Sequence, residues 1–308
     1  MNVLVTGGAG FIGRWIVKKL AEQGHDVSVI DDLSNGREEN LAEFGIKPIL
    51  CDIVDRKKIT EIFKDGYDLC IHAAAQINVQ ESLDNPEKSV SVNISGTFNI
   101  LEGARKHNTK VVLMGTCMVY DLADTSKPIS ENHPIKPASP YAASKLAAEE
   151  LALSYYLGYK LPVVILRPFN TYGPFQKSNM EGGVVSIFIK RNLSGEDLFV
   201  YGDGTQTRDL LYVEDCADFV VKASMSKKAE GEIINAGLGR DISINNLAYI
   251  ICQKKERIKH IPHHHPQSEI KKLICDYSKA KKLISWEPKT TLEEGIRKTS
   301  EWIKANEI

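Results

Sequence analysis

Tyr141 and Lys145 lie four positions apart in the segment Ser139 to Lys145. One turn of helix would place both side chains on the same face. On that face the Lys145 ammonium would stabilise a phenolate and lower the pKa of Tyr141 toward working pH. A tyrosinate held in this way is a general base for the oxidation of an alcohol.

A glycine-rich turn lies near the start of the chain. Gly7, Gly10 and Gly13 follow an apolar run at residues 3–5 and precede an amphipathic stretch at residues 15–20. A strand, a glycine turn and a helix in this order predict a dinucleotide cradle. Each motif alone also fits an ordinary helix or a tight turn, and it is their combination that favours dinucleotide-dependent redox chemistry.

These two motifs resemble those of the extended short-chain dehydrogenase/reductase family, and the resemblance runs over nearly the whole chain. It implies a nucleotide-sugar epimerase or dehydratase that uses NAD, with Phe11 and Ile12 completing the cofactor turn. It also makes Thr116 the third member of an oxidation triad with Tyr141 and Lys145. Lys145 would also bind the nicotinamide ribose. Asn93 matches a residue that braces the helix beside the site, although an ordinary helix-surface amide is an alternative.

The order of apolar runs predicts an α/β fold. Strand-like runs at 27–30, 48–51, 69–72, 111–114 and 163–166 are separated by stretches with helical periodicity. This alternation predicts a Rossmann-type, doubly wound parallel sheet with ligands at the carboxyl ends of its strands. A smaller, interleaved C-terminal region would bind substrate. We expect residues 1–167 and about 205–236 to form the NAD-binding domain, and residues 168–204 and about 237–308 to form the nucleotide-sugar-binding region. Strand-like runs at 209–213 and 232–235 would return to the main sheet.

Composition narrows the classes of partner. The 308 residues carry a formal net charge of -1 without a basic stripe, so no nucleic-acid partner is expected. The six cysteines show no C-x-x-C spacing, which indicates a reducing compartment. A strand already at residue 3 leaves no room for a signal peptide, and no run of about 18 apolar residues suggests a membrane span. We therefore expect a cytoplasmic protein.

Acidic and small residues follow the predicted strands on the cofactor side. Asp31 and Asp32 close the second strand, where a carboxylate would accept the ribose hydroxyls and repel a 2′-phosphate. NAD is therefore favoured over NADP, although Arg37 lies close enough to hold a phosphate. The resemblance places adenine and the cofactor backbone against residues after the third and fourth strands: Asp52, Ile53, Ala73, Ala74 and Ala75. Close packing alone explains the three alanines equally well.

The segment 200–215 resembles the part of nucleotide-sugar enzymes that binds a nucleoside diphosphate. The resemblance implies that Tyr201 lies against the base and that Arg208 binds the diphosphate, while Asn170 binds a diphosphate oxygen or the pyranose. Val184 is a further candidate for substrate contact. An ion pair with Asp203 or Asp209 is the alternative role for Arg208.

Cys117 and Met118 depart from the family pattern. Related 4,6-dehydratases have an acid pair at these positions, and 4-epimerases generally have small residues. A thiol can still act as a general acid, whereas a methionine carries no proton. The pair resembles a UDP-GlcNAc 5,6-dehydratase subgroup, which oxidises C4, eliminates water across C5 and C6, and returns the hydride. A UDP-hexose 4-epimerase is the alternative, in which both residues only line the sugar pocket.

Three further expectations complete the interpretation. The run 263–265 consists of three histidines flanked by prolines, and it fits a solvated loop better than a metal site, because adjacent side chains do not converge readily on one ion. No metal is expected. The resemblance implies a homodimer built from helices near residues 89–106 and 141–156. A non-catalytic NAD-binding regulator is a third functional alternative, against which the complete set of triad residues argues.

Overall fold

The computed structural model describes residues 1–121, 127–179, 183–262 and 271–308. Within them, seven parallel strands form one sheet in the order β10-β6-β5-β4-β1-β2-β3. The strands are β1 (Asn2–Thr6), β2 (Asp26–Asp31), β3 (Ile49–Leu50), β4 (Leu69–His72), β5 (Lys110–Met114), β6 (Val163–Pro168) and β10 (Ile233–Ala236). The predicted Rossmann-type fold is confirmed.

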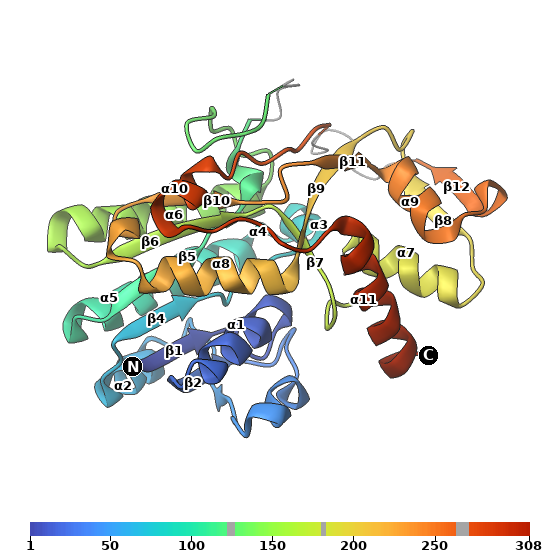
Figure 1. Cartoon of the computed structure of the whole chain (residues 1–308). Coiled ribbons are helices and arrows are strands. Elements are labelled where there is room, and N and C mark those ends of the chain that lie inside the picture. The colour runs from blue at the N-terminus through green and yellow to red at the C-terminus, as the bar shows by residue number, and fades with distance from the viewer. Residues whose placement is uncertain (122–126, 180–182, 263–270) are drawn as a thin grey trace.

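Helices cover both faces of this sheet (Figure 1). On one side lie α1 (Phe11–Glu22) and α8 (Val213–Met225), and on the other lie α2 (Arg56–Ile62), α5 (Thr97–His107) and α6 (Pro140–Tyr159). Side chains alternate across the strands, so Val3 and Val5 pack with α1 while Leu4 packs with α5. Both faces are thus buried, which is why the strands are continuous apolar runs.

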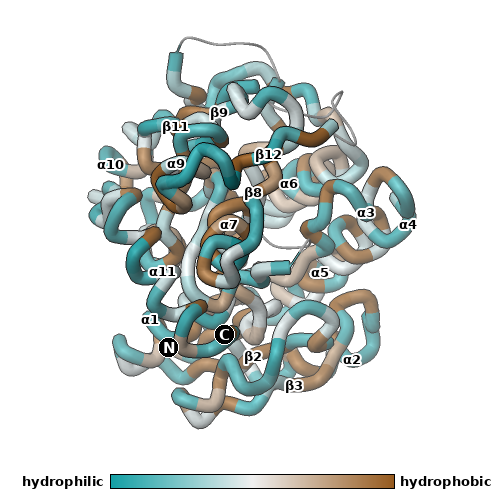
Figure 2. Tube along the Cα trace, turned by 90° about the vertical axis from the view of Figure 1, so that its right-hand side faces the viewer, coloured by the Kyte–Doolittle hydropathy of each residue, from teal (hydrophilic) through white to brown (hydrophobic). Residues whose placement is uncertain are grey.

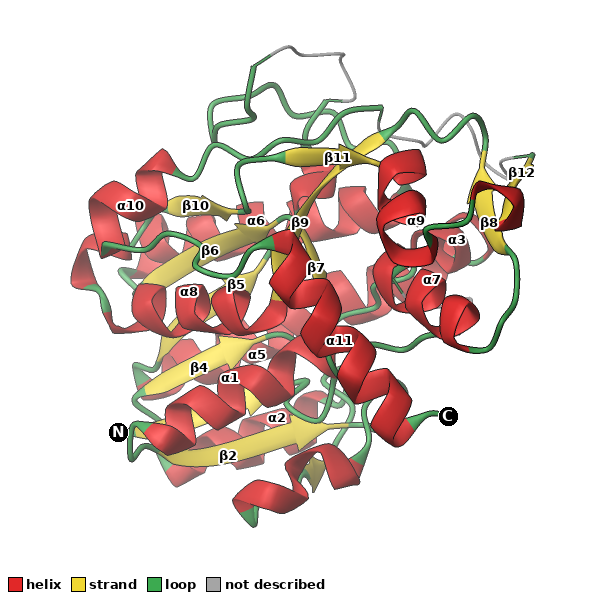
Figure 3. Cartoon of the chain, turned by 45° about the vertical axis from the view of Figure 1, so that its right-hand side comes forward, coloured by secondary structure: helices red, strands yellow, loops and turns green. Residues whose placement is uncertain are grey.

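A smaller region lies beyond the carboxyl ends of these strands (Figure 3). Its strands are β7 (Asn170–Tyr172), β8 (Leu198–Tyr201), β9 (Thr207–Tyr212), β11 (Asp241–Ser243) and β12 (Ile258–Ile261), and its helices are α7 (Val184–Leu193), α9 (Ile244–Cys252) and α11 (Leu292–Asn306). Figure 2 faces this region, with α7, β8, α9 and β12 lying together. Phe188, Leu247 and Ile303 belong to its separate apolar core.

One predicted strand joins a different sheet. We expected residues 209–213 to return to the main sheet, but β9 pairs with β7 and β11 in a three-stranded sheet. Buried Asp209 accepts backbone N–H bonds from Leu238, Gly239 and Cys275, and these bonds tie β9 to the chain that enters β11 and α10 (Ser278–Ile284). The expected return at 232–235 is confirmed, because β10 pairs with β6. The domain boundaries stay a prediction.

Shorter helices complete the described chain. They are α3 (Val79–Asp84), α4 (Pro86–Ser89) and α10 (Ser278–Ile284), a π-helical segment Val90–Gly96, and 3₁₀ helices at Glu38–Phe44, Phe63–Asp65, Cys117–Val119, Lys227–Ala229 and Lys255–Arg257. None of the helices in the described ranges has the length and apolar character needed to cross a bilayer. All six cysteines are free and buried.

Candidate active site

A cavity of about 2,180 Å³ opens at the carboxyl ends of the parallel strands, as expected for this kind of sheet. Its walls come from both regions, including the turn after β1, the loops after β2, β4 and β5, and the C-terminal part of α11. A drug-sized ligand occupies a pocket of roughly 300–1,000 Å³. The cavity therefore has room for two ligands side by side.

Most of the residues predicted to bind or react line this cavity. They are Gly7, Gly10, Phe11, Ile12, Gly13, Asp31, Asp32, Asp52, Ile53, Ala73, Ala74, Ala75, Thr116, Cys117, Met118, Tyr141, Lys145, Asn170 and Arg208. Among the described residues that form its walls, Asn93, Val184 and Tyr201 do not appear. Val184 begins α7 and Tyr201 ends β8. Because neither is among the described wall residues, their contact with substrate stays a prediction.

The glycine turn fits a dinucleotide. Gly7 has a φ of +70°, and a Cβ at this position would come within 2.7 Å of the Ala74 nitrogen. A Cβ at Gly13 would overlap the Gly7 oxygen, so only glycine allows α1 to approach the turn. Gly10 is the N-cap of α1, and no described side chain caps this helix end. Backbone N–H groups at such an end favour a diphosphate.

Asp31 and Asp32 lie at the end of β2 and make different contacts in the structure without bound ligands. Asp31 is buried and accepts the N–H groups of Ala9 and Leu33, each at 2.9 Å, so it fixes the glycine turn against β2. Asp32 is exposed and accepts the Ser34 hydroxyl at 2.7 Å. Two carboxylates in this part of the cavity wall disfavour an additional phosphate, although Arg37 lines the cavity as well.

Asn93 is a buried brace between the cavity wall and α6. Its Oδ1 accepts the Gln76 N–H at 2.8 Å, and its Nδ2 donates to the Gln76 carbonyl at 3.0 Å and to the Ser144 hydroxyl at 2.9 Å. Gln76 lines the cavity, and Ser144 precedes Lys145. The alternative of a helix-surface amide is wrong, because Asn93 is only 2% exposed.

α6 carries Tyr141 and Lys145 into the cavity wall. The helix begins where the sequence favours it, because the Ser139 hydroxyl accepts the Ala142 N–H at 3.2 Å and Pro140 occupies the first turn. Tyr141 and Lys145 are both buried and line the cavity on the same helix face. Thr116, directly after β5, hydrogen-bonds the Tyr141 side chain.

The pKa of Tyr141 does not follow the direction expected from Lys145 alone. Burial raises the pKa of Tyr141 to about 12, and the hydrogen bond from Thr116 only partly opposes this effect. Burial also lowers the pKa of Lys145 to about 8. The expected lowering of the tyrosine pKa is therefore wrong for the protein without ligands, because desolvation of the phenolate is the largest effect and Lys145 is not among the groups that act on this pKa.

Cys117 lines the cavity next to this triad. Burial raises the pKa of its thiol to about 12, with a further increase from Asp209, so the sulfur stays protonated at neutral pH. Cys117 also contributes to the raised pKa of Tyr141, which places the two side chains within electrostatic reach. Met118 follows it in the wall, and its N–H donates to the Thr116 hydroxyl at 3.2 Å.

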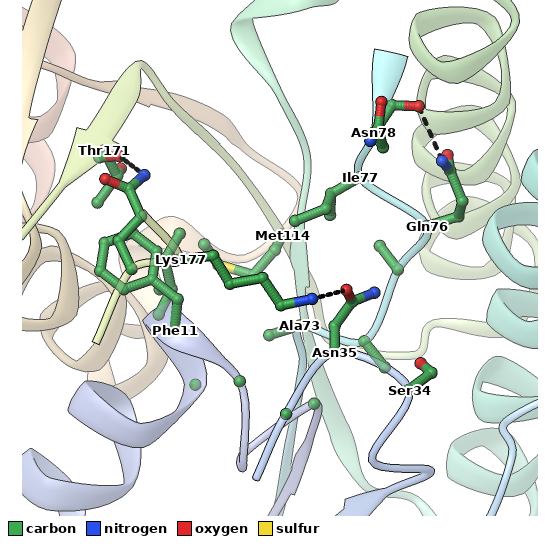
Figure 4. A pocket seen from close by; sticks show the side chains of 18 of the residues that line it. Phe11, Ser34, Asn35, Ala73, Gln76, Ile77, Asn78, Met114, Thr171 and Lys177 are labelled. Atoms are coloured by element: carbon green, nitrogen blue, oxygen red, sulfur yellow. Dashed lines mark hydrogen bonds between the residues drawn. The ribbon is translucent and has the colours of Figure 1, made fainter. Parts of the chain in front are cut away.

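Several cavity residues carried no recognisable signal in the sequence. Figure 4 shows Lys177 reaching across the cavity above Phe11, where its ammonium donates to the Asn35 side chain at 2.8 Å. Glu307, which follows α11, accepts a hydrogen bond from Lys190 at 2.9 Å and one from Ser178. These residues meet through tertiary contacts between distant segments, and no local pattern marks them.

The sequence model of the NAD dependent epimerase/dehydratase family matches residues 3–237. The chain belongs to the NAD-dependent epimerase/dehydratase family. Members of this family and their named relatives are enzymes, so this chain is an enzyme, and the alternative of a non-catalytic regulator is set aside.

Three relatives show how closely family members resemble this enzyme. Pal from Bacillus thuringiensis is 56% identical, with a TM-score of 0.97 and 99% of each chain covered. The UDP-glucose 4-epimerase of Mycolicibacterium smegmatis is 36% identical over 99% of each chain. The UDP-glucose 4-epimerase of Thermus thermophilus, solved with NAD, is 33% identical with a TM-score of 0.92 and covers 99% of this chain and 100% of its own. Other matches are named as a decarboxylase and as dehydratases. Membership of the family therefore establishes the general type of reaction but not the specific reaction.

NAD is the cofactor of this epimerase/dehydratase. Its residues suit the cofactor, because the glycine cradle, the carboxylates after β2 and the residues Tyr141 and Lys145 all line one cavity. The histidine run 263–265 lies outside the described residues. In the part of the chain that is described, no cluster of three or more His, Cys, Asp or Glu could hold a metal ion.

Replacing Lys177 with methionine is expected to weaken NAD retention. The substitution removes the bond to Asn35 across the cavity and a positive charge above the start of α1. A hydrogen bond of this kind contributes about 1 kcal/mol, so NAD should dissociate about fivefold faster. Retention can be measured by rapid gel filtration of the loaded enzyme. Lys304→Met, on the exposed side of α11, is the matched control, and equal release from both variants would contradict the prediction.

Proposed function

We propose that this enzyme is a nucleotide-sugar dehydratase that acts by transient oxidation at C4 of the sugar. The substrate class is a UDP- or dTDP-hexose such as UDP-GlcNAc, and water is eliminated in the 4,6- or the 5,6-sense. The observation that carries this proposal is the protonated thiol of Cys117 in the cavity wall beside Thr116 and Tyr141. A proton donor next to a redox centre is what loss of a hydroxyl group requires.

The redox half of the proposal uses the triad. Bound NAD would accept a hydride from C4 and later return it. Tyr141, as the phenolate, takes the proton of the C4 hydroxyl, and Thr116 shares that hydrogen bond. Lys145, as the ammonium on the same face of α6, stabilises the phenolate. The O–H electron pair thereby becomes the second bond of a C4 carbonyl, and the C4–H pair leaves with the hydride.

The elimination half uses Cys117. A carbonyl at C4 acidifies the hydrogen on C5, so the C5–H electron pair forms the C5–C6 double bond as the C6 hydroxyl takes the thiol proton and leaves as water. The resulting thiolate is a strong base, because burial raises the pKa of Cys117 to about 12. It can therefore recover a proton from C5, which restores the thiol and balances the step. Met118 offers an apolar neighbour that carries no proton.

A UDP-hexose 4-epimerase is the second candidate. It is favoured by relatives named UDP-glucose 4-epimerase that match nearly the whole chain, such as the M. smegmatis protein at 36% identity over 99% of each chain. In this case the 4-keto sugar turns within the cavity and receives the hydride on its other face. Cys117 and Met118 would then only line the sugar pocket.

Product analysis tests the proposal. The purified enzyme is incubated separately with UDP-GlcNAc, UDP-glucose and dTDP-glucose in deuterated water, and the products are analysed by mass spectrometry. Loss of one water supports a dehydratase, and the position of deuterium separates 4,6- from 5,6-elimination. A product that keeps its water but changes chromatographic retention contradicts dehydration and supports the epimerase.

Arg208→Lys is expected to weaken substrate binding with little effect on the chemical step. Arg208 lines the cavity, and a planar guanidinium can hold two diphosphate oxygens at once, which a lysine cannot. Loss of one charge-assisted hydrogen bond costs about 1.5–3 kcal/mol, so KM should rise about tenfold or more while kcat changes little. Steady-state kinetics measure both. Arg240→Lys, at an exposed position, is the control, and a fall in kcat at unchanged KM would contradict the role.

The dimer is also a proposal. α6 exposes Leu157 and Tyr159, at 67% and 59%, and packs beside α5. Large exposed apolar side chains that lie together at one end of a helix suit a protein interface. Light scattering coupled to gel filtration should give twice the monomer mass, and a monomer would contradict the proposal.

The cytoplasmic location stays a prediction.

A further inference from the structure

Glu149 and Arg167 form an ion pair that is completely enclosed. Both side chains are 0% exposed, and the Glu149 Oε2 accepts from the Arg167 Nη2 at 2.6 Å and from its Nε at 3.0 Å. Burying two charges costs several kcal/mol, and an apolar pair of similar volume is often equally stable. Stability alone is therefore a weak reason for this pair.

The position of Glu149 suggests another role. It follows Lys145 by four residues and Tyr141 by eight, so one face of α6 carries all three buried side chains. This face continues from the cavity wall into the protein. Glu149 itself does not line the cavity in the described structure, so it reaches the reacting atoms only through its neighbours.

The second carboxylate oxygen of Glu149 lies under the floor of the cavity. Within the described residues, Oε1 has no partner at full hydrogen-bonding geometry, and the Thr116 N–H is the backbone donor close enough to lower the pKa of Glu149. It lies so close to Gly115 that a Cβ added there would overlap it. Gly115 lines the cavity and precedes Thr116, so the absence of a side chain at 115 is what admits the oxygen.

We propose that Glu149 is a positioning residue that holds Lys145 as an ammonium beneath the cavity and that Gly115 provides the space for its carboxylate. This inference rests on the proposed roles of Tyr141 and Lys145. Glu149 favours the protonated form of Lys145 and disfavours the phenolate of Tyr141. Burial raises the pKa of Glu149, and Arg167 opposes this effect through a hydrogen bond and its charge, both of which favour the ionised carboxylate.

The other titratable groups that face Lys145 do not supply this charge. His72, at the end of β4, faces Lys145 from the sheet, and burial lowers the pKa of His72 to about 3, so it is neutral. Its ring nitrogens contact the hydroxyls of Thr6 at 2.7 Å and of Thr97 at 3.0 Å. Tyr141 lies on the same helix as Lys145. Glu149 is thus the carboxylate that acts on Lys145 among the described residues.

Glu149→Gln is expected to move the whole pH profile of turnover toward acid. Removal of the negative charge lowers the pKa of Lys145, so the alkaline loss of activity begins at lower pH. It also lowers the pKa of Tyr141, so the acid limb moves in the same direction. A displacement of about one pH unit corresponds to a tenfold change in each protonation equilibrium. Glu150→Gln, on the exposed side of α6, should leave the profile in place.

A second measurement reads Lys145 without turnover. The fraction of Lys145 modified by a small amine-reactive reagent, followed by peptide mass spectrometry across pH, gives its titration midpoint. We expect a lower midpoint in Glu149→Gln than in the wild type and the Glu150→Gln control. An unchanged midpoint in folded Glu149→Gln overturns the inference, whereas a wild-type enzyme that turns over no nucleotide sugar overturns the proposed function instead.

Glu149→Gln leaves the buried Arg167 without its carboxylate partner, which can prevent folding. A double variant therefore accompanies it. Glu149→Gln with Arg167→Met removes both charges from the interior. The lower Lys145 midpoint should persist, because Arg167 pairs with Glu149 and Tyr120 and is not among the groups that shift the pKa of Lys145. A return of the Lys145 titration midpoint to the wild-type value would show that the unpaired charge of Arg167 caused the effect, and would overturn the role of Glu149.

Discussion

Tyr141→Phe is expected to bind NAD and nucleotide sugar normally and to lose turnover by about three orders of magnitude. Phenylalanine keeps the ring that fills the cavity wall, but it removes the only atom of this side chain that can take the C4 hydroxyl proton. General base catalysis by a positioned side chain contributes about 10²–10⁴-fold to a rate. Turnover is measured by mass spectrometry of products, and ligand binding by calorimetry.

Tyr249→Phe is the matched control for this variant. Tyr249 lies on α9, is 47% exposed and is not among the described residues of the cavity wall, so its hydroxyl has no access to the cavity chemistry. Loss of its hydroxyl should leave turnover within about twofold, as is usual for surface changes. If Tyr141→Phe retained more than about a tenth of wild-type turnover, Tyr141 would not be the base.

Cys117→Ala is expected to separate the two halves of the proposed reaction. The triad is intact in this variant, so a C4 deuterium label on the sugar should still pass to the bound cofactor. Water loss should fall by at least about a hundredfold, because the C6 hydroxyl no longer receives a proton from the wall. The label is followed by mass spectrometry of the released cofactor, and water loss by mass spectrometry of the sugar product.

Cys275→Ala controls for the loss of a buried thiol. Cys275 is 2% exposed and belongs to the same apolar cluster as Cys117, but it is not among the described residues of the cavity wall. Its removal should lower stability and leave the products unchanged. Full dehydration by Cys117→Ala would reject the thiol as the acid and leave Cys117 as a lining residue of an epimerase-type cavity.

Much of the fold could be predicted because buried parallel strands leave a local signal. The runs at 69–72 and 111–114 are apolar on both faces and match β4 and β5. The run at 209–213 is also apolar, but an apolar run does not specify which sheet it joins. β9 pairs with β7 and β11, and its buried Asp209 is held by backbone N–H groups about 30 and 66 positions further along the chain.

The residues of the site also fall into those that the sequence predicts and those that it does not. The glycine turn and the pair Tyr141 and Lys145 could be predicted because each motif lies within one short stretch of the sequence. Lys177 could not be, because its partner Asn35 lies 142 residues away. The direction in which the pKa of Tyr141 shifts could not be predicted from the sequence either, because it depends on how completely the folded protein removes water from the ring.

The place of β10 in the main sheet has a consequence for synthesis of the protein. β6 pairs with β5 on one side and with β10 on the other, and the chain between β6 and β10 builds much of the smaller region first. While the ribosome is still making that segment, β6 presents an unpaired edge rich in valine, isoleucine and leucine. Such edges are templates for aggregation. The nascent protein therefore exposes this strand edge until residues 233–236 are made, and a chain that ends between residues 168 and 233 would keep the edge of β6 unpaired.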